Sequence, residues 1–328
     1  GRRPILLLSV VFFSIPYLVL CLLDLTRNRT AYNYFSLVLP VQSIGGSVGS
    51  IMGMCYAYTS DCVPPERTTA VFANIMGISL GIGYGSSIFY GWVYNQGEHL
   101  QFFKSVLTAT CCLLILLAAV LPESNPRRQH ADRPPPRIKD FNPAKGLRLL
   151  NGNMLPRENT RLLRLIFWVM MLFYIVKIGL IMALGLFAKQ VFGFNAYQRG
   201  LLGAVYGVCS AFGNWSVSWL LMRFSKKRLI CFGASCLLLA CAIPALPKGA
   251  TSGNWLYMSE ALQGAADMLY PVCVACATQI VPHQSAGEAA SLVSSLINLN
   301  GAIGPCIFGI FAKAFLSTDY PGGALLVL

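Results

Sequence analysis

Three ionisable side chains lie within stretches that are otherwise almost free of charge. Lys177 falls inside the apolar stretch Leu165–Phe187, and Glu260 and Asp267 fall inside Trp255–Val281. Each stretch exceeds the ~20 residues that a helix needs to cross a bilayer's hydrocarbon core. A charge at the centre of a bilayer costs at least ~2.5 kcal/mol, so such side chains usually face one another or a wet cavity. Their presence is typical of proton and solute pathways.

The polar residues of the second stretch share one helical face. Glu260, Gln263 and Asp267 are spaced i, i+3, i+7, which places them on the same side of a helix. At ~1.5 Å per residue, Lys177 lies about 18 Å and Asp267 about 21 Å from the expected cytoplasmic ends of their stretches. We therefore expect these two residues to form an intramembrane ion pair. A substrate or a proton could break the pair during turnover; alternatively, the pair is permanent and only structural.

Other polar side chains in apolar stretches are weaker candidates for substrate contact. Gln42, Asn214 and Asn298 are of this kind, although a polar group inside a membrane often only bonds to a neighbouring helix, for a modest ~0.6 kcal/mol. Glu260 is nearer the outer end of its stretch, so it is either a coupling acid or simply solvated. The three histidines all fall in predicted loops. We therefore expect neither a metal site nor a cofactor.

The composition agrees with a protein that spans a membrane many times. Of the 328 residues, 55% are hydrophobic and 11% charged, whereas soluble domains carry about 25% charged residues. Because the apolar runs are too long for barrel strands, the expected fold class is an all-α integral membrane protein. The sequence predicts nine spans, with a tenth beginning near Gly323: Pro4–Leu23, Tyr34–Thr59, Val71–Tyr94, Phe102–Leu121, Leu165–Phe187, Leu201–Leu221, Leu229–Leu246, Trp255–Val281 and Leu292–Phe315.

The net charge of +13 does not indicate a nucleic-acid partner, because the basic residues lie between the apolar runs. Ten of them fall within Glu123–Arg164, which the positive-inside rule assigns to the cytoplasm. The same segment contains three consecutive prolines from Pro134, a composition typical of a linker. The predicted organisation is a helical bundle at residues 1–122, a cytoplasmic linker at 123–164 and a second bundle at 165–328.

The two bundles show a weak internal repeat. Pro64 and Pro282 are 282 − 64 = 218 residues apart, and Gly85 and Gly304 are 304 − 85 = 219 residues apart. Parallel repeats of this kind relate the halves of some transporters.

Several short motifs resemble the major facilitator superfamily, in particular its tetracycline-resistance-like and hippocampus-abundant-transcript-like branch. The opening Gly1-Arg2-Arg3 matches the end of the loop between the family's second and third spans, "YAYTSDCVPPER" matches the exit from its fourth span, and "LPES" the exit from its sixth. The resemblance implies two pseudo-symmetric helical bundles that here lack the first two spans and most of the last. It also implies a cavity lined by the spans that carry Lys177 and Asp267.

The resemblance also implies roles for charged and small residues at helix ends. Asp61 and Arg67 would belong to an inner charge network that latches the outward-open state, or else form a simple helix-end pair. A second group of residues would form a gate between the halves or only allow close helix packing: Gly81, Gly85, Gly301, Gly304 and Pro305. This sequence departs from the antiporter pattern, because Gln42 occupies the place of a buried arginine and Ser86 that of a proline.

These observations favour a secondary active transporter of a small organic solute that works by alternating access. Coupling to protons through Asp267 or Glu260, as an antiporter or a symporter, and uncoupled uniport both stay open. The alternative is a non-transporting receptor, sorting factor or scaffold with the same fold. An enzyme is not expected, because the sequence has no catalytic triad order, metal cluster or phosphate loop. The expected partners are the solute, protons and the lipid of a plasma membrane or endomembrane, with the protein as a monomer.

Overall fold

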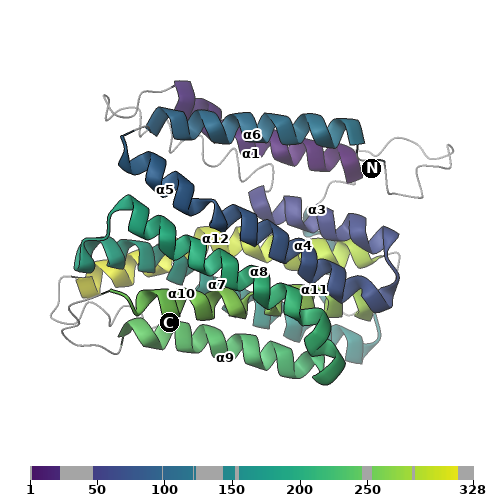
Figure 1. Ribbon diagram of the computed structural model, residues 1–328. Helices are drawn as coiled ribbons and strands as arrows, with labels where there is room; N and C mark the ends of the chain where they lie inside the picture. Colours follow the sequence, from purple (N-terminus) through teal and green to yellow (C-terminus); the bar gives the residue numbers. More distant parts are fainter. Residues whose placement is uncertain are drawn as a thin grey trace. The chain divides into compact units, whose positions relative to one another are not determined.

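The chain is described here by a computed structural model, which covers residues 2–22, 47–97, 99–120, 122, 143–151, 155–245, 253–282 and 285–316. Within these ranges the regular structure is helical (Figure 1). The helices are α1 (Arg2–Leu22), α3 (Ser47–Cys62), α4 (Pro65–Gly85), α5 (Ser87–Asn95), α6 (His99–Val120), the 3₁₀ helix η3 (Pro143–Asn151), α7 (Arg157–Phe192), α8 (Ala196–Arg223), α9 (Lys226–Ala245), α10 (Leu256–Ala266), α11 (Leu269–Ile280) and α12 (Ala286–Leu316).

Most of the predicted spans correspond to these helices. Three helical stretches within the described ranges are long and apolar enough to cross a membrane, namely Glu66–Asn95, Arg157–Phe192 and Lys226–Pro244. Much of the predicted second span, and the start of a tenth near Gly323, lie outside the described residues.

Two segments differ from their predicted boundaries. The final residues of the predicted linker are not linker-like, because α7 already begins at Arg157, and Pro143–Asn151 is a short helix. The predicted continuous span Trp255–Val281 is divided into α10 and α11.

The helices pack into two compact units that do not follow chain order. One unit comprises residues 1–65, 99–167 and 276–298, and the other comprises 66–98, 168–275 and 299–328. In the first unit, α1 packs against both α3 and α6. In the second, α8 packs against α5 and α10, and α10 also packs against α9 (Figure 1). The bundle boundaries expected from chain order stay a prediction.

The ends of α7 and α8 follow directly from local sequence. Glu158 lies in the first turn of α7 and Lys189 in its last, which matches the partial charges at the two helix ends. Gly193 then adopts a φ of 67°, a conformation that glycine reaches without a steric penalty. The Asn195 side chain accepts from the backbone of Gln198, and the Gln198 side chain accepts in return, so a capping box starts α8.

The break between α10 and α11 also has a local cause. In an unbroken helix, the backbone N–H of residue 271 would donate to the carbonyl of Asp267, but Pro271 has no N–H. Instead, Tyr270 donates to the Asp267 carbonyl at 3.2 Å, and Asp267 donates to Gly264 at 3.1 Å. Both are three-residue bonds, so the helix tightens into a turn. This turn places Asp267 at the break between the two helices.

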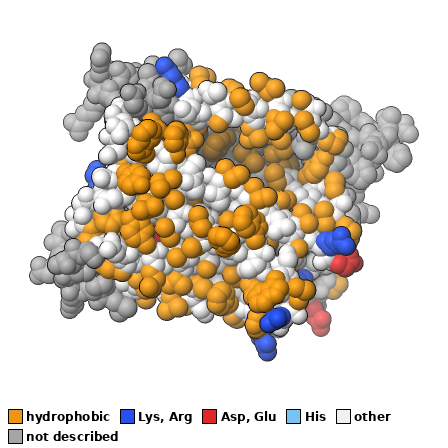
Figure 2. All heavy atoms as spheres, viewed as in Figure 1, with side chains coloured by type: hydrophobic (Ala, Val, Ile, Leu, Met, Phe, Trp, Pro, Cys, Tyr) orange, Lys and Arg blue, Asp and Glu red, His pale blue; other side chains and the backbone are white. Residues whose placement is uncertain are grey.

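The outward-facing side chains suit a lipid environment. Figure 2 shows a face on which hydrophobic side chains predominate and the described charged side chains appear only near the edges. Exposed large hydrophobic residues are numerous on α4, α5 and α8, and include Ile82, Trp92, Phe212, Trp219 and Met222. A surface of this kind is unfavourable in water and is typical of helices that contact lipid. The protein is therefore a multi-pass integral membrane protein, as the sequence predicted.

Candidate binding and coupling site

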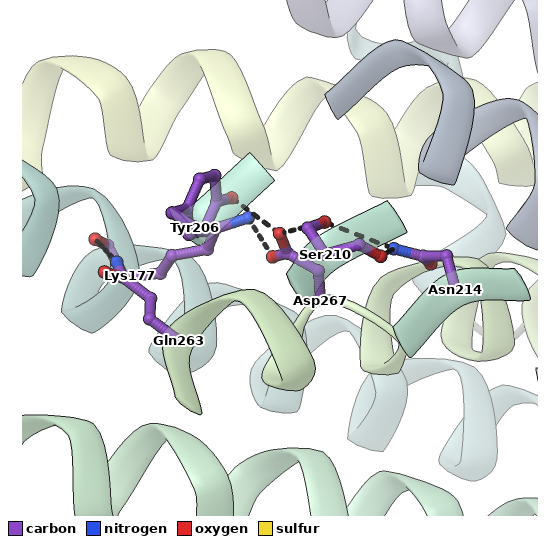
Figure 3. Close-up of polar contacts among 6 residues, drawn as sticks. All are labelled: Lys177, Tyr206, Ser210, Asn214, Gln263 and Asp267. Atoms are coloured by element: carbon purple, nitrogen blue, oxygen red, sulfur yellow. Dashed lines mark hydrogen bonds and ion pairs between the residues drawn. The ribbon is translucent and has the colours of Figure 1, made fainter. Parts of the chain in front are cut away.

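A buried ion pair lies within the second unit. Lys177 of α7 donates from Nζ to Oδ1 of Asp267, at the break between α10 and α11 (Figure 3). Lys177 is 4% exposed and Asp267 is fully buried. The ammonium also lies over the rings of Tyr174 and Tyr206, 5.3 and 5.6 Å from their centroids. Aromatic faces attract a cation, so Lys177 is held by both a carboxylate and two rings.

The second oxygen of Asp267 is bound by hydroxyl groups from α8. Oδ2 accepts a hydrogen bond from the Tyr206 hydroxyl at 2.5 Å and another from Ser210 Oγ at 2.8 Å. Together with Lys177, the carboxylate therefore has three side-chain donors. This satisfies the rule that a buried charge must be paired and hydrogen-bonded to be tolerated.

Two amide side chains extend the network at its opposite ends (Figure 3). Gln263 Nε2 donates to the backbone carbonyl of Lys177 at 3.1 Å. Asn214 Nδ2 donates to the Ser210 carbonyl at 2.8 Å and to Ser210 Oγ at 3.4 Å. The oxygens of both amides are buried and receive no hydrogen bond from the described residues. The amide nitrogens therefore take part in the network, whereas the two amide oxygens have no donor among the described residues.

Glycine brings α10 close enough to α8 for these contacts. A Cβ at Gly264 would lie 2.5 Å from the Tyr206 carbonyl oxygen and 2.8 Å from the Ser210 backbone nitrogen. No side chain fits there, so the two backbones are in direct contact at this level. Because Asp267 lies about one turn beyond Gly264, its carboxylate comes within hydrogen-bonding distance of both hydroxyls.

Span α4–α5 packs on the other side of α8 and adds a further aromatic ring. Tyr84, near the end of α4, meets Tyr206 edge to face with 4.5 Å between ring centroids. Ser87 Oγ donates to the Gly200 carbonyl at 2.8 Å, and a Cβ at Gly200 would lie 2.5 Å from the Ser87 carbonyl. The approach of α5 to α8 is therefore as close as that of α10, and it places Tyr84 against the ring whose hydroxyl binds Asp267.

Of the seven residues that the sequence singled out as candidates for substrate contact or coupling, four meet or adjoin this site. Lys177 and Asp267 form the expected pair, and Gln263 and Asn214 border it. Gln42 lies outside the described residues, and Asn298 is half-buried in α12 within the other unit.

Glu260 needs a correction. Solvation was one of its two expected states, but the side chain is only 7% exposed. It lies on the same face of α10 as Gln263, and no described residue donates a hydrogen bond or forms an ion pair with its carboxyl group.

The predicted gating and packing residues differ among themselves. A Cβ at Gly81 would lie 3.0 Å from Ala211 Cβ, and one at Gly304 would lie 3.3 Å from the Ile175 carbonyl, so both positions are tightly packed. At Gly85 and Gly301 an added Cβ would meet nothing within 4 Å. A side chain would therefore fit at both positions without a clash.

The remaining members of that group are less informative. Pro305 lies within α12 and Asp61 within α3, with side chains outside what the structure describes. Arg67 is exposed in the first turn of α4. The charge latch and the gate stay predictions.

Sequence reasoning missed the hydroxyl donors of the site. Tyr206, Ser210 and Asn214 are spaced by four residues along α8, so they share one helical face. That spacing could have been noticed, because it matches the polar face of α10. What could not be inferred was that the two faces meet.

Among the described residues, no group of three or more His, Cys, Asp or Glu side chains could hold a metal ion.

Comparison with known proteins identifies the family. The family model of the Major Facilitator Superfamily matches residues 1–305. The chain belongs to this superfamily. The family that the short motifs indicated is thereby confirmed, and so is the expected fold class.

Individual relatives are distant but match along nearly the whole chain. A probable peptidoglycan muropeptide transporter SLC46 from Drosophila melanogaster is 23% identical over 336 residues, covering 98% of this chain and 63% of the relative. The class H tetracycline resistance protein of Pasteurella multocida is 24% identical over 319 residues, covering 94% of this chain and 72% of the relative. The crystal structure of the human organic anion transporter MFSD10 (TETRAN) matches with a TM-score of 0.65 and 19% identity, covering 100% of this chain and 76% of that one. The chain therefore spans only part of the length of these three proteins, and less than two thirds of the first.

Proposed function

We propose that the protein is a secondary active transporter that moves a small organic solute by alternating access, with the Lys177–Asp267 pair as its coupling element. One observation carries this proposal: a lysine and a carboxylate pair inside the membrane at the point where a helix is broken. Discontinuous helices at the level of the bilayer midplane form the substrate and ion sites of many transporters.

The pair has two protonation states that matter for transport. In the paired state the two charges cancel, and Tyr206 and Ser210 satisfy the remaining carboxylate oxygen. If Asp267 takes up a proton, the carboxyl group becomes neutral and Lys177 is free to bind an anionic group or to remain over its two tyrosine rings. A buried charge cannot be left without a partner at low cost, so proton uptake and a change of partner for Lys177 are coupled.

The relatives support an organic solute as the cargo. Their names describe a probable muropeptide transporter, a tetracycline resistance protein and an organic anion transporter. The site combines charged, amide and aromatic side chains, which is the usual lining of a site for a small organic molecule. We further propose that the protein works as a monomer in a plasma membrane or endomembrane.

Flux measured in proteoliposomes that contain the full-length protein tests the proposal. A broad panel of metabolites and drugs is offered with and without a pH gradient, to the parent protein and to Asp267→Asn. The matched control is Ser259→Ala, because Ser259 is buried on the same helix but donates to the Ala240 carbonyl on α9, away from the pair.

A solute whose flux follows the pH gradient, and is lost in Asp267→Asn but kept in Ser259→Ala, would support proton-coupled transport. Flux that ignores pH in the parent protein would refute the coupling role and indicate a uniporter. No flux across the whole panel would instead favour a receptor or scaffold with the same fold.

A further inference from the structure

We propose that the site recognises a solute that carries a protonated amine together with a further hydroxyl or N–H donor, held by Glu260 and Gln263 of α10 and by Asn214 of α8. This inference rests on the proposed function and adds the chemical class of the substrate. It starts from the groups that the Lys177–Asp267 network leaves over.

The amide oxygens of Gln263 and Asn214 border the pair and have no hydrogen-bond donor among the described residues. The carboxylate of Asp267 already has three donors, and Lys177 is its cation. The Gln263 amide donates one N–H to a backbone carbonyl, and the Asn214 amide donates to the Ser210 carbonyl and hydroxyl, whereas the oxygens of both amides have no donor among the described residues. Buried polar atoms are almost always hydrogen-bonded in proteins. Two buried acceptors next to a charged pair therefore predict a ligand that brings its own N–H or O–H groups.

The charges favour an amine among such ligands. At this level the described side chains include one cation, Lys177, and two carboxyl groups, Asp267 and Glu260. Lys177 neutralises Asp267, which leaves Glu260 buried and without a bonded partner among the described residues. Glu260 and Gln263 are three residues apart on the same face of α10, so one ammonium group can lie between them. An ammonium that donates to a carboxylate forms a strong, charge-assisted bond.

Aromatic side chains complete the recognition of a cation. Tyr84 lies against Tyr206, whose hydroxyl donates to Asp267. A cation that enters beside Asp267 is therefore also near aromatic rings, which favour it further. The acceptor oxygens are closed off in this structure, so the ligand enters when α4–α5 and α8 move apart, as alternating access requires.

Two isosteric probe series test the class directly. In one, tyramine, tyrosol and 4-hydroxyphenylacetate share a skeleton and differ in one end group, which is an ammonium, an alcohol or a carboxylate. In the other, glucosamine, glucose and glucuronate share a sugar ring; glucosamine carries an ammonium in place of the C2 hydroxyl, and glucuronate carries a carboxylate at C6. Each probe is added at millimolar concentration to the full-length protein in lipid nanodiscs, and the apparent Kd is taken from the shift in thermal stability.

The expected result is that the amine of at least one series binds about tenfold more tightly than its alcohol. Glu260→Gln abolishes this preference, and Ser259→Ala leaves it intact. Gln263→Met weakens binding of both the amine and the alcohol, because it removes a buried acceptor oxygen that has no donor among the described residues. The same variant loses the hydrogen bond to the Lys177 carbonyl, so its melting temperature falls slightly in either case. A Gln263 with a merely structural role would show that loss of stability with binding unchanged.

Three results would overturn the inference: tighter binding of the carboxylate members, an amine preference that survives Glu260→Gln, or no stabilisation by any member of either series. The proposed function fails separately. If the amine binds as expected but no bound probe crosses proteoliposome membranes, the recognition chemistry stands and the transporter assignment does not.

Discussion

Removing only one partner of the Lys177–Asp267 pair should destabilise the protein far more than removing both. Asp267→Asn leaves Lys177 buried with two tyrosine rings but no counter-charge, and Lys177→Met leaves the carboxylate with only the hydroxyls of Tyr206 and Ser210. Breaking a buried pair from one side costs about 3–5 kcal/mol. We expect each single variant near the lower end of this range, because each remaining charge keeps some partners.

The double variant Lys177→Met/Asp267→Asn should recover most of this loss. Methionine and asparagine match the volumes of the residues they replace, and neutral replacements of buried ion pairs are often no less stable than the pair. Two charges 4 Å apart attract by about 4 kcal/mol at the effective dielectric of a protein. The coupling energy from the double-variant cycle should therefore be about 2–4 kcal/mol, well above the ~0.5 kcal/mol within which independent sites add.

Unfolding of the full-length protein in denaturing detergent measures these free energies, with Ser259→Ala as the control, and proteoliposome flux is measured on the same four proteins. If the destabilisations simply add, the pair contributes no mutual stabilisation and the description of the site is wrong. If the double variant recovers both stability and pH-driven flux, the pair is only structural. Recovered stability with abolished coupling is the result that the proposed mechanism requires.

Further predictions follow from individual contacts. Gly200→Ala should lower thermal stability markedly, because its Cβ would lie 2.5 Å from the Ser87 carbonyl oxygen. Gly83→Ala, whose Cβ would meet nothing within 4 Å, should be neutral or stabilising by up to ~1 kcal/mol. Equal melting temperatures for the two variants would contradict the close approach of α5 to α8. Tyr206→Phe should lower the free energy of unfolding by about 1.5–3 kcal/mol, since a hydrogen bond to the Asp267 carboxylate is lost. A Tyr206→Phe variant as stable as the parent protein would argue against that bond.

Much of the fold could be predicted because membrane insertion depends on local sequence. Whether a segment spans a bilayer depends on its length and its lack of charge, and both can be judged without knowing what it contacts. The matching depth of Lys177 and Asp267 follows from the same reasoning, since the rise per residue is fixed in a helix. Even the division of Trp255–Val281 has a local cause in Pro271, although periodicity alone did not reveal it.

The partners of the pair could not be predicted, because they depend on how each helix is rotated and how closely it approaches its neighbours. Gly264 and Gly200 set those approaches, but a glycine within an apolar run does not say which helix it will face. The contact of Tyr84 with Tyr206 joins residues 122 positions apart (206 − 84 = 122).

The sequence by itself therefore determined that the protein spans a membrane, which superfamily it resembles, and where two opposite charges lie at the same depth. Only the tertiary structure decided that Tyr206 and Ser210 hold the carboxylate, that Glu260 is buried, and that two amide oxygens are left without donors among the described residues. The physical reason is that hydrophobicity and helical rise belong to a segment, whereas hydrogen bonds between helices belong to a particular packing of several segments.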